Sequence, residues 1–195
     1  METKNFSYHI ELNNTVIDDG FWSNVQKTVT DKVIPYQYEA LNDRIENAEK
    51  SYCVENFKKA SEIVNRLKNG EKVPVYPADK WCYDDNNCDE NAFHGWVFQD
   101  SDAYKWLEAA SYSLQRKYDS ELYEKSCELI DIICSAQMEN GYLDTLYIIN
   151  DRDKAFSNLR DFHELYCFGH LAEAGVAFYQ ATGNKKLLCA AMKFA

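Results

Sequence analysis

Two short segments carry the side chains best suited to chemistry. One is Asp100-Ser101-Asp102, and the other is Asp161-Phe162-His163-Glu164. The second resembles a capping box, in which Asp161 caps a helix and Glu164 occupies the third helical position. This spacing places His163 in the first turn of a helix, where its imidazole can contact a ligand or bond to a neighbouring loop.

The acidic residues of both segments also have a structural explanation. Ser101 or a flanking aspartate can cap a helix, and the carboxylates of Asp100 and Asp102 interact favourably with the positive end of the helix dipole. Capping explains Glu164 in the same way. The residue types therefore allow both a structural and a ligand-binding role for these acids.

A metal site is a further reading of the second segment. His163, Cys167 and His170 are spaced i, i+4, i+7, so they would share roughly one face of a helix, and zinc binds such side chains. A fourth ligand would have to come from elsewhere, and the neighbouring apolar residues indicate core. We expect no metal site here, and none at Cys82 and Cys88, which lie in an acidic loop.

The composition excludes several classes of function. Asp and Glu number 32 against 21 Lys and Arg, a formal charge of −11, whereas nucleic acids and anionic membranes attract basic surfaces. The start of the chain leads into no apolar signal segment, and no run is long enough for a membrane span. The seven cysteines are odd in number and scattered, which suits a reducing cytoplasm. The many aromatic residues (14 Tyr, 10 Phe, 4 Trp) suit either a core or a sugar-binding surface.

The elements that must position these residues are mostly helices. Residues 1–20 alternate loosely and predict a short strand or extended arm. From Trp22 the period changes to three or four, which predicts a helix interrupted at Pro35. A second helix covers about 54–67. Residues 70–100 form a long loop punctuated by Pro and Gly, and long loops are often functional.

Four more helices follow at close spacing. Their apolar stripes cover about 104–118, 122–136, 165–179 and 184–195, and Asn184 is a good N-cap for the last one. This order predicts stacked helical hairpins, either a solenoid or a closed α/α toroid. The chain stops at Ala195 inside an apolar helical run, so we expect a truncated domain whose last helix exposes Leu187, Leu188 and Met192.

Three segments together resemble glycoside hydrolase family 127, the β-L-arabinofuranosidase family. The first is Val33-Ile34-Pro35-Tyr36-Gln37-Tyr38, which follows Gly20-Phe21-Trp22. The second runs from Phe93 to Ala109. The third runs from Ala136 through residues 141–145 to His163-Glu164-Leu165-Tyr166, with Gly169-His170-Leu171 and Ala181-Thr182-Gly183-Asn184 as its tail. Residues 44–92 fit this pattern much less well.

The resemblance implies an all-α fold, namely the first part of an (α/α)₆ barrel over residues 21–195, preceded by an arm at 1–20. It implies a retaining glycosidase that acts on β-L-arabinofuranosides with a zinc-bound cysteine thiolate as nucleophile and a glutamate as acid/base. All of these catalytic groups would lie beyond Ala195, together with the rest of the barrel. This chain would then hold no catalytic residue and no metal, and would be inactive alone.

The resemblance also implies that His163 contacts a sugar hydroxyl, and Asp100, Asp102, Trp106 and Glu164 are the other candidate contacts. Paired carboxylates of a glycosidase need a fixed separation across the scissile bond, and no spacing in this chain identifies such a pair. Two other classes of function stay open. One is a helical-repeat scaffold that binds proteins, and the other is a different α/α-barrel sugar enzyme, such as a lyase or an epimerase.

Overall fold

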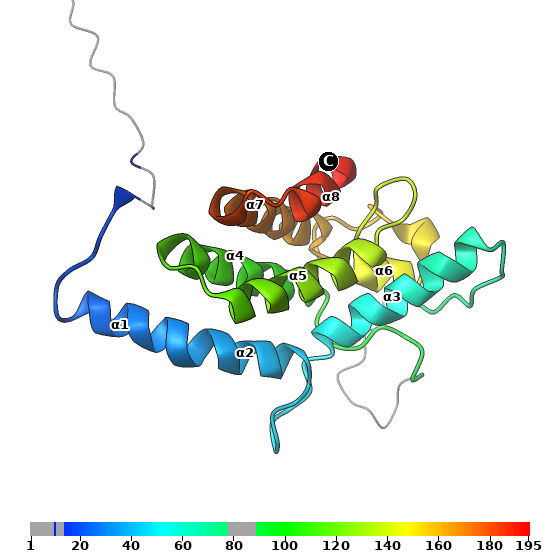
Figure 1. Ribbon diagram of the computed structural model, residues 1–195. Coiled ribbons are helices and arrows are strands. Elements are labelled where there is room, and N and C mark those ends of the chain that lie inside the picture. Colours follow the sequence, from blue (N-terminus) through cyan, green and yellow to red (C-terminus); the bar gives the residue numbers. More distant parts are fainter. Residues whose placement is uncertain (1–9, 11–13, 78–88) are drawn as a thin grey trace, which may run out of the picture.

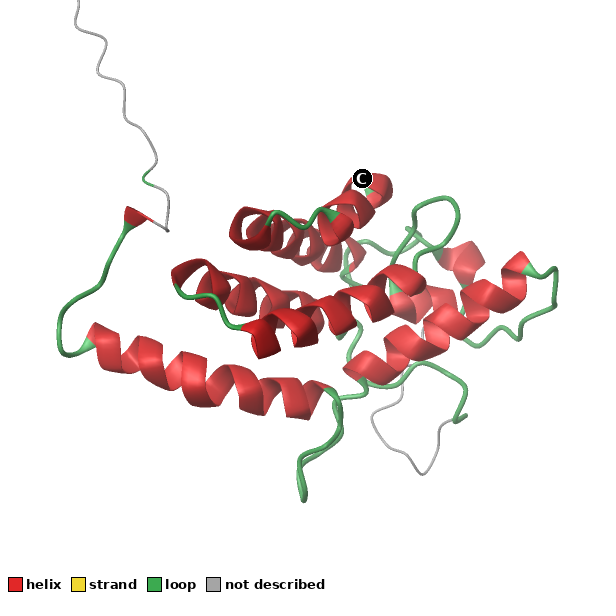
Figure 2. Ribbon diagram, in the orientation of Figure 1, coloured by secondary structure: helices red, strands yellow, loops and turns green. Residues whose placement is uncertain are grey.

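The computed structural model describes residues 10, 14–77 and 89–195 (Figure 1). Every regular element in these ranges is helical and none is a β-strand (Figure 2), which confirms the predicted all-α class. The elements are α1 (Trp22–Thr28), η2 (Val29–Val33), α2 (Ile34–Leu41), α3 (Cys53–Lys68), α4 (Asp100–Arg116), α5 (Ser120–Ser135), α6 (Thr145–Ile149), η3 (Arg152–Lys154), α7 (Glu164–Thr182) and α8 (Lys186–Phe194).

The helix interrupted at Pro35 is confirmed, and the interruption is a π-helical turn. In η2 the amide of Ile34 donates to the carbonyl of Val29, five residues earlier. Pro35 then lies in the first turn of α2, where a missing amide hydrogen does least harm. The helix axis therefore continues through the turn, and α1, η2 and α2 form one long rod (Figure 1).

Two helical hairpins stack beside this rod, as the spacing of the apolar stripes predicts. The α4–α5 hairpin lies between the rod and the α7–α8 hairpin (Figure 1). The most extensive packing joins α4 to α7, through fully buried residues such as Leu107 and Ala110 on α4 and Leu171 and Ala174 on α7. Helix α3 covers one end of the stack by packing on α5 and α6. The N-terminal ends of α4 and α7 consequently belong to one rigid core.

The last hairpin is packed more tightly than the sequence predicts. A Cβ added at Gly175 on α7 would lie 3.0 Å from Cα of Leu188 on α8, so the two backbones approach closely. Leu187 is fully buried, and its predicted exposure is wrong because this side of α8 faces the core. Met192 is exposed as expected, and Leu188 is half-buried. The predicted N-cap at Asn184 is wrong by one residue, because Lys185 is the N-cap of α8; Oδ1 of Asn184 nevertheless accepts from the amide of Lys186, the first residue of the helix.

Some expectations fall on residues outside the described ranges. These include most of the 1–20 arm, residues 78–88 of the predicted long loop, and with them Cys82 and Cys88. The described part of the arm, residues 10 and 14–20, includes no strand. Within the described ranges, no helix combines the length and the apolar character needed to cross a membrane.

Candidate functional site

His163 lies at the start of α7, beside the start of α4. Its ring meets that of Phe98, which precedes α4, at a centroid distance of 5.6 Å. The capping box predicted for this segment is wrong. Helix α7 begins at Glu164, and His163 itself is the N-cap residue, with a left-handed backbone (φ 60°) and no side-chain cap bond. A non-glycine residue in this conformation is uncommon.

The hydrogen bond of His163 defines which ring nitrogen is available. Nδ1 lies 2.9 Å from the backbone oxygen of Asp161. A carbonyl oxygen only accepts, so Nδ1 carries the hydrogen and donates it. In the neutral imidazole, Nε2 is then an acceptor. The loop before α7 therefore presents Nε2 to accept a hydrogen bond from a ligand hydroxyl.

Glu164 is fully buried and supports the loop that carries His163. Its carboxylate accepts hydrogen bonds from the amide of Phe156 (2.9 Å to Oε1) and from the hydroxyl of Tyr142 (2.5 Å). Burial and the nearby carboxylates of Asp144 and Glu164 raise the pKa of Tyr142, so its hydroxyl stays protonated as a donor. The Glu164 side chain thus holds residues 156–164 in a closed loop and does not reach the surface.

Asp100 fixes the start of α4 in a similar way. It is 3% exposed, and its carboxylate accepts from the amide (2.8 Å) and the hydroxyl of Thr145 at the start of α6. Burial raises the pKa of Asp100 to about 6, although both bonds from Thr145 act in the opposite direction. Burial followed by the charges of Asp100 and Glu164 raises the pKa of Asp144, the N-cap of α6, well above its ordinary value. Three buried carboxyl groups thus lie beneath the loop ends.

Aromatic rings form a continuous strip above these acids. Trp96 and Phe98 are stacked at 5.8 Å, and Phe98 meets His163. His163 contacts Tyr166 edge-on at 5.8 Å, and Tyr166 contacts His170 at 4.6 Å. We call these five residues the aromatic rim. Trp96 and Tyr166 are 53% and 43% exposed, so each exposes part of its ring system to solvent.

Polar side chains continue the rim toward α3 and α2. Gln99 Nε2 donates to Asp102 Oδ2 (2.9 Å) and to Ser51 Oγ (3.3 Å). Lys105 donates to Ser101 Oγ, and its ammonium lies 5.0 Å from the centroid of the Tyr166 ring. Burial raises the pKa of Asp102, while the charges of Lys105 and His170 lower it. We call Ser51, Gln99, Asp102 and Lys105 the polar row.

A groove of about 380 Å³ borders the polar row between α2 and α4, a size suited to a small ligand. Ser51, Asp102 and Lys105 line it together with Trp106. Trp106 is only 3% exposed, and its indole nitrogen donates to the carbonyl of Ile34 (2.9 Å), so it mainly joins α2 to α4. Of the five predicted contacts, the structure brings His163 and Asp102 to the surface, whereas Asp100, Trp106 and Glu164 are buried.

His163, Cys167 and His170, which share helical spacing, do not come together as a metal site. Cys167 is 1% exposed, and burial, followed by the charges of Asp144 and Asp100, raises the pKa of its thiol. In the described ranges, the group of His, Cys and acidic residues close enough to share one ion includes His170 but neither His163 nor Cys167. His163 is held apart by its bond to Asp161.

Tyr166, Phe98 and Lys105 are members of this surface that the sequence did not single out. Tyr166 follows His163 by three residues, one helical turn, and this spacing was the available signal. Phe98 and Lys105 bracket the Asp100 segment but come together with α7 only through the packing of α4 on α7. No local pattern encodes that contact.

Comparisons with known proteins agree with this architecture. The family model described as β-L-arabinofuranosidase, GH127 catalytic domain, matches residues 14–195. A non-reducing end β-L-arabinofuranosidase from Bifidobacterium longum subsp. longum is 37% identical over 199 aligned positions, which cover 93% of this chain and 26% of that protein.

Solved structures show the same relationship. The crystal structure of a GH127 β-L-arabinofuranosidase from Geobacillus stearothermophilus T6 superposes with a TM-score of 0.75 at 42% identity, over 92% of this chain and 24% of that one. A second GH127 β-arabinofuranosidase superposes with a TM-score of 0.71 at 26% identity, over 94% and 25%. The chain thus spans about a quarter of the length of these relatives, as a partial (α/α)₆ toroid does. With its helical hairpins and a family match over residues 14–195, this chain belongs to the GH127 β-L-arabinofuranosidase catalytic-domain family.

Proposed function

We propose that this chain is the N-terminal part of a retaining, zinc-dependent glycosidase that hydrolyses β-L-arabinofuranosides. The chain supplies the first helices of the barrel (residues 21–195, after the arm at 1–20) and a sugar-binding surface. The observation that carries the proposal is the aromatic rim around His163, at the shared N-terminal ends of α4 and α7. The family match makes this reading stronger than the helical-repeat scaffold or the lyase and epimerase alternatives.

The aromatic rim and the polar row contact different parts of the sugar. The rings of Trp96 and Tyr166 offer apolar faces for the C–H side of a furanose. His163 Nε2 accepts a hydrogen bond from one hydroxyl, since Nδ1 is engaged by the carbonyl of Asp161. Asp102 accepts from a second hydroxyl, held by its bond from Gln99. Such a mixture of rings and a few fixed polar atoms is typical of small-ligand sites.

The three buried candidates act on the sugar indirectly in this proposal. Glu164 holds the loop that gives His163 its left-handed backbone. Asp100 sets the start of α4, and therefore the position of Asp102, through its bonds from Thr145. Trp106 fixes α2 against α4 along the groove beside the polar row. Each is a positioning residue for the substrate.

The residues of this chain do not fit the zinc centre that the resemblance implies. In the described ranges, Cys53 and Cys167 are buried thiols whose pKa values burial raises, the reverse of what a zinc-bound thiolate needs. We propose that the zinc ligands, the nucleophile and the acid/base all follow Ala195 in the sequence. No catalytic step is assigned to this chain.

The proposal also names the surroundings of the protein. The five described cysteines are free thiols, which agrees with a reducing cytoplasm as the compartment. The partners are a carbohydrate substrate and the remaining part of the same barrel. With a net charge of −11, the chain is not expected to bind nucleic acid or an anionic membrane.

A matched pair of tryptophan variants tests the proposal in the complete protein. Trp96 on the rim and Trp22 on the α1 rod are similarly exposed, at 53% and 57%. Trp96→Ala is expected to raise KM for an aryl β-L-arabinofuranoside several-fold, while Trp22→Ala leaves it unchanged. Equal effects of the two variants, or no turnover of β-L-arabinofuranosides by the complete protein, would refute the proposal.

A further inference from the structure

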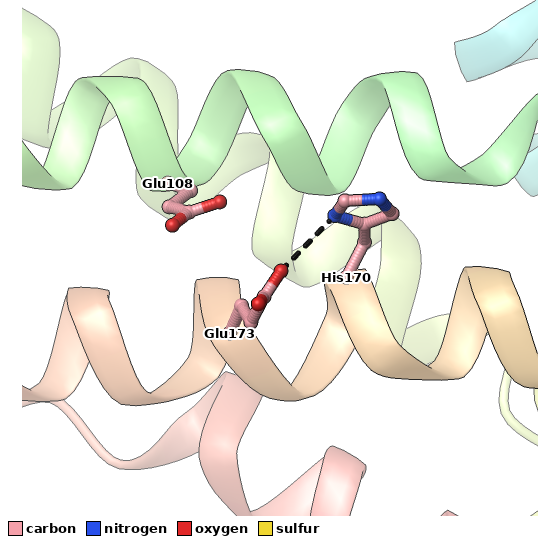
Figure 3. Close-up of side chains that lie close together, drawn as sticks. All are labelled: Glu108, His170 and Glu173. Atoms are coloured by element: carbon pink, nitrogen blue, oxygen red, sulfur yellow. Dashed lines mark ion pairs between the residues drawn. The ribbon is translucent and has the colours of Figure 1, made fainter.

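Three potential metal ligands meet where the middle of α4 faces α7. Glu108 comes from α4, and His170 and Glu173 come from α7 (Figure 3). One ligand atom from each lies within 4.8 Å of the other two. A zinc ion with ligands at about 2.0–2.2 Å brings its donors to about 3.4 Å from one another, a gap that rotation of two glutamate side chains can close.

The imidazole of His170 is directed into this cluster. Its Nδ1 lies 3.2 Å from Glu173 Oε2, on the side that faces both glutamates (Figure 3). This nitrogen is shielded from solvent. Its ion pair with Glu173 lacks the geometry of a hydrogen bond, so within the described part of the chain the nitrogen has no hydrogen bond. Tyr166 contacts the ring edge-on at 4.6 Å and limits its rotation. A buried nitrogen without a hydrogen bond is unfavourable, and a bound cation would satisfy it.

Apart from His170, the two carboxylates have no basic partner among the residues that the structure describes. Among the described residues, no Lys or Arg forms an ion pair with Glu108 or Glu173. Tyr112 donates a 2.8 Å hydrogen bond to Glu108 Oε1, which fixes the carboxylate and leaves Oε2 available. Hydrogen bonds of this kind orient the ligands of metal sites. A groove of about 340 Å³, lined by Glu108, Tyr112, Glu173 and Gln180, opens onto the cluster and gives an ion access.

We propose that Glu108, His170 and Glu173 bind one divalent transition-metal ion of the Zn²⁺ type, which joins α4 to α7. One imidazole and two carboxylates match the ligand preferences of such ions. Ca²⁺ and Mg²⁺ fit less well because they favour oxygen ligands alone. The proposal does not depend on the glycosidase function. The cluster lies about two to three helical turns after His163 along α7, and it shares only His170 with the aromatic rim.

Cobalt titration of the metal-free 195-residue chain tests the site directly, since Co²⁺ substitutes for Zn²⁺ and reports its ligands by absorption. We expect one equivalent of Co²⁺ to give visible d–d bands without the near-ultraviolet thiolate charge-transfer band of a cysteine ligand. Zn²⁺ should displace the Co²⁺ and erase the bands. The melting temperature should rise with metal concentration, because only the folded chain presents the ligands together.

Single substitutions identify the ligands. Glu173→Gln and His170→Gln should each weaken Co²⁺ binding at least tenfold, and Glu173 is exposed enough that its variant should fold normally. Glu121→Gln is the matched control, because Glu121 is an exposed helical glutamate paired with Lys125 on α5. Three results would each overturn the proposal: no binding by the folded chain, a spectrum dominated by thiolate, or equal weakening by the Glu121 variant. The first result would leave His170 and Glu173 as a helical ion pair only.

Discussion

Replacement of His163 by two different residues separates a sugar contact from a structural role. Asn tolerates the left-handed backbone (φ 60°), and its Nδ2 can replace Nδ1 as donor to the carbonyl of Asp161. His163→Asn therefore keeps the backbone conformation and the bond to Asp161, and it removes the Nε2 acceptor together with the ring contacts to Phe98 and Tyr166. His163→Ala removes both nitrogens, so the left-handed backbone at this position loses the bond to the carbonyl of Asp161 that supports it.

The structure gives the expected size of each effect. Loss of the Nε2 bond to a sugar hydroxyl removes about 0.5–1.5 kcal/mol, or roughly two- to thirteen-fold in kcat/KM of the complete enzyme. His163→Asn should show this loss with an almost unchanged melting temperature. His163→Ala also loses the Nδ1 bond, a further cost of about 0.5–1.5 kcal/mol, and about 1 kcal/mol shifts Tm by roughly 2–4 °C in a domain of this size.

Kinetics and melting of both variants decide between the two roles. Aryl β-L-arabinofuranoside turnover is measured on the complete enzyme, and thermal unfolding on the 195-residue chain. A contact through Nε2 requires that Asn and Ala lose comparable catalytic efficiency while only Ala loses stability. If His163→Asn retains full kcat/KM, the imidazole serves the loop alone, and the reasoning from its tautomer fails.

Three further results are expected. The 195-residue chain alone should not hydrolyse p-nitrophenyl β-L-arabinofuranoside, and turnover by pure chain that is lost on mutation of a residue within it would contradict this. The chain should be more stable at pH 5 than at pH 8, because the folded pKa of Asp100, about 6, exceeds its unfolded value. The stability that this shift contributes below pH 4 is lost as the pH rises through 6. About 1–1.5 kcal/mol of it is lost between pH 5 and pH 8, and Asp100→Asn should flatten the dependence of Tm on pH. Gly141→Ala should lower Tm far more than Gly183→Ala. Both glycines have positive φ, but only at Gly141 would a Cβ overlap the backbone carbonyl of Lys193 on α8. Equal losses of Tm in the two variants would exclude that overlap as the cause.

The helices could be predicted from the sequence because their apolar stripes are local patterns. Helix α3, predicted at about 54–67, forms at Cys53–Lys68, and the interruption near Pro35 is present. Helix α6 was missed because Thr145–Ile149 is buried on all sides and too short to show a helical period. The π-helical form of η2 has no sequence signal beyond the proline.

The site was harder to predict because burial depends on tertiary contacts. The segment at His163 has the residue types of a capping box, yet Glu164 bonds instead to Phe156 and Tyr142, and His163 takes the N-cap position. The sequence around Asp100 predicts a helix cap at the surface, but its carboxylate accepts a hydrogen bond from Thr145, 45 residues away. The positions of the acids relative to the core therefore follow from the packing of α4 and α6, which local spacing does not encode.

Histidine imidazole NMR tests whether a β-L-arabinofuranoside binds at the aromatic rim through His163 Nε2. The chain has only four histidines, so their ring ¹⁵N signals can be assigned by substitution. On addition of methyl β-L-arabinofuranoside, the Nε2 signal of His163 should move in a saturable manner, while that of the buried His94 stays fixed. A smaller response to the α-anomer would show selection of the β-linkage. If the His163 signal does not move at saturating sugar, or moves equally with an unrelated hexose, then this surface is not the sugar-binding site.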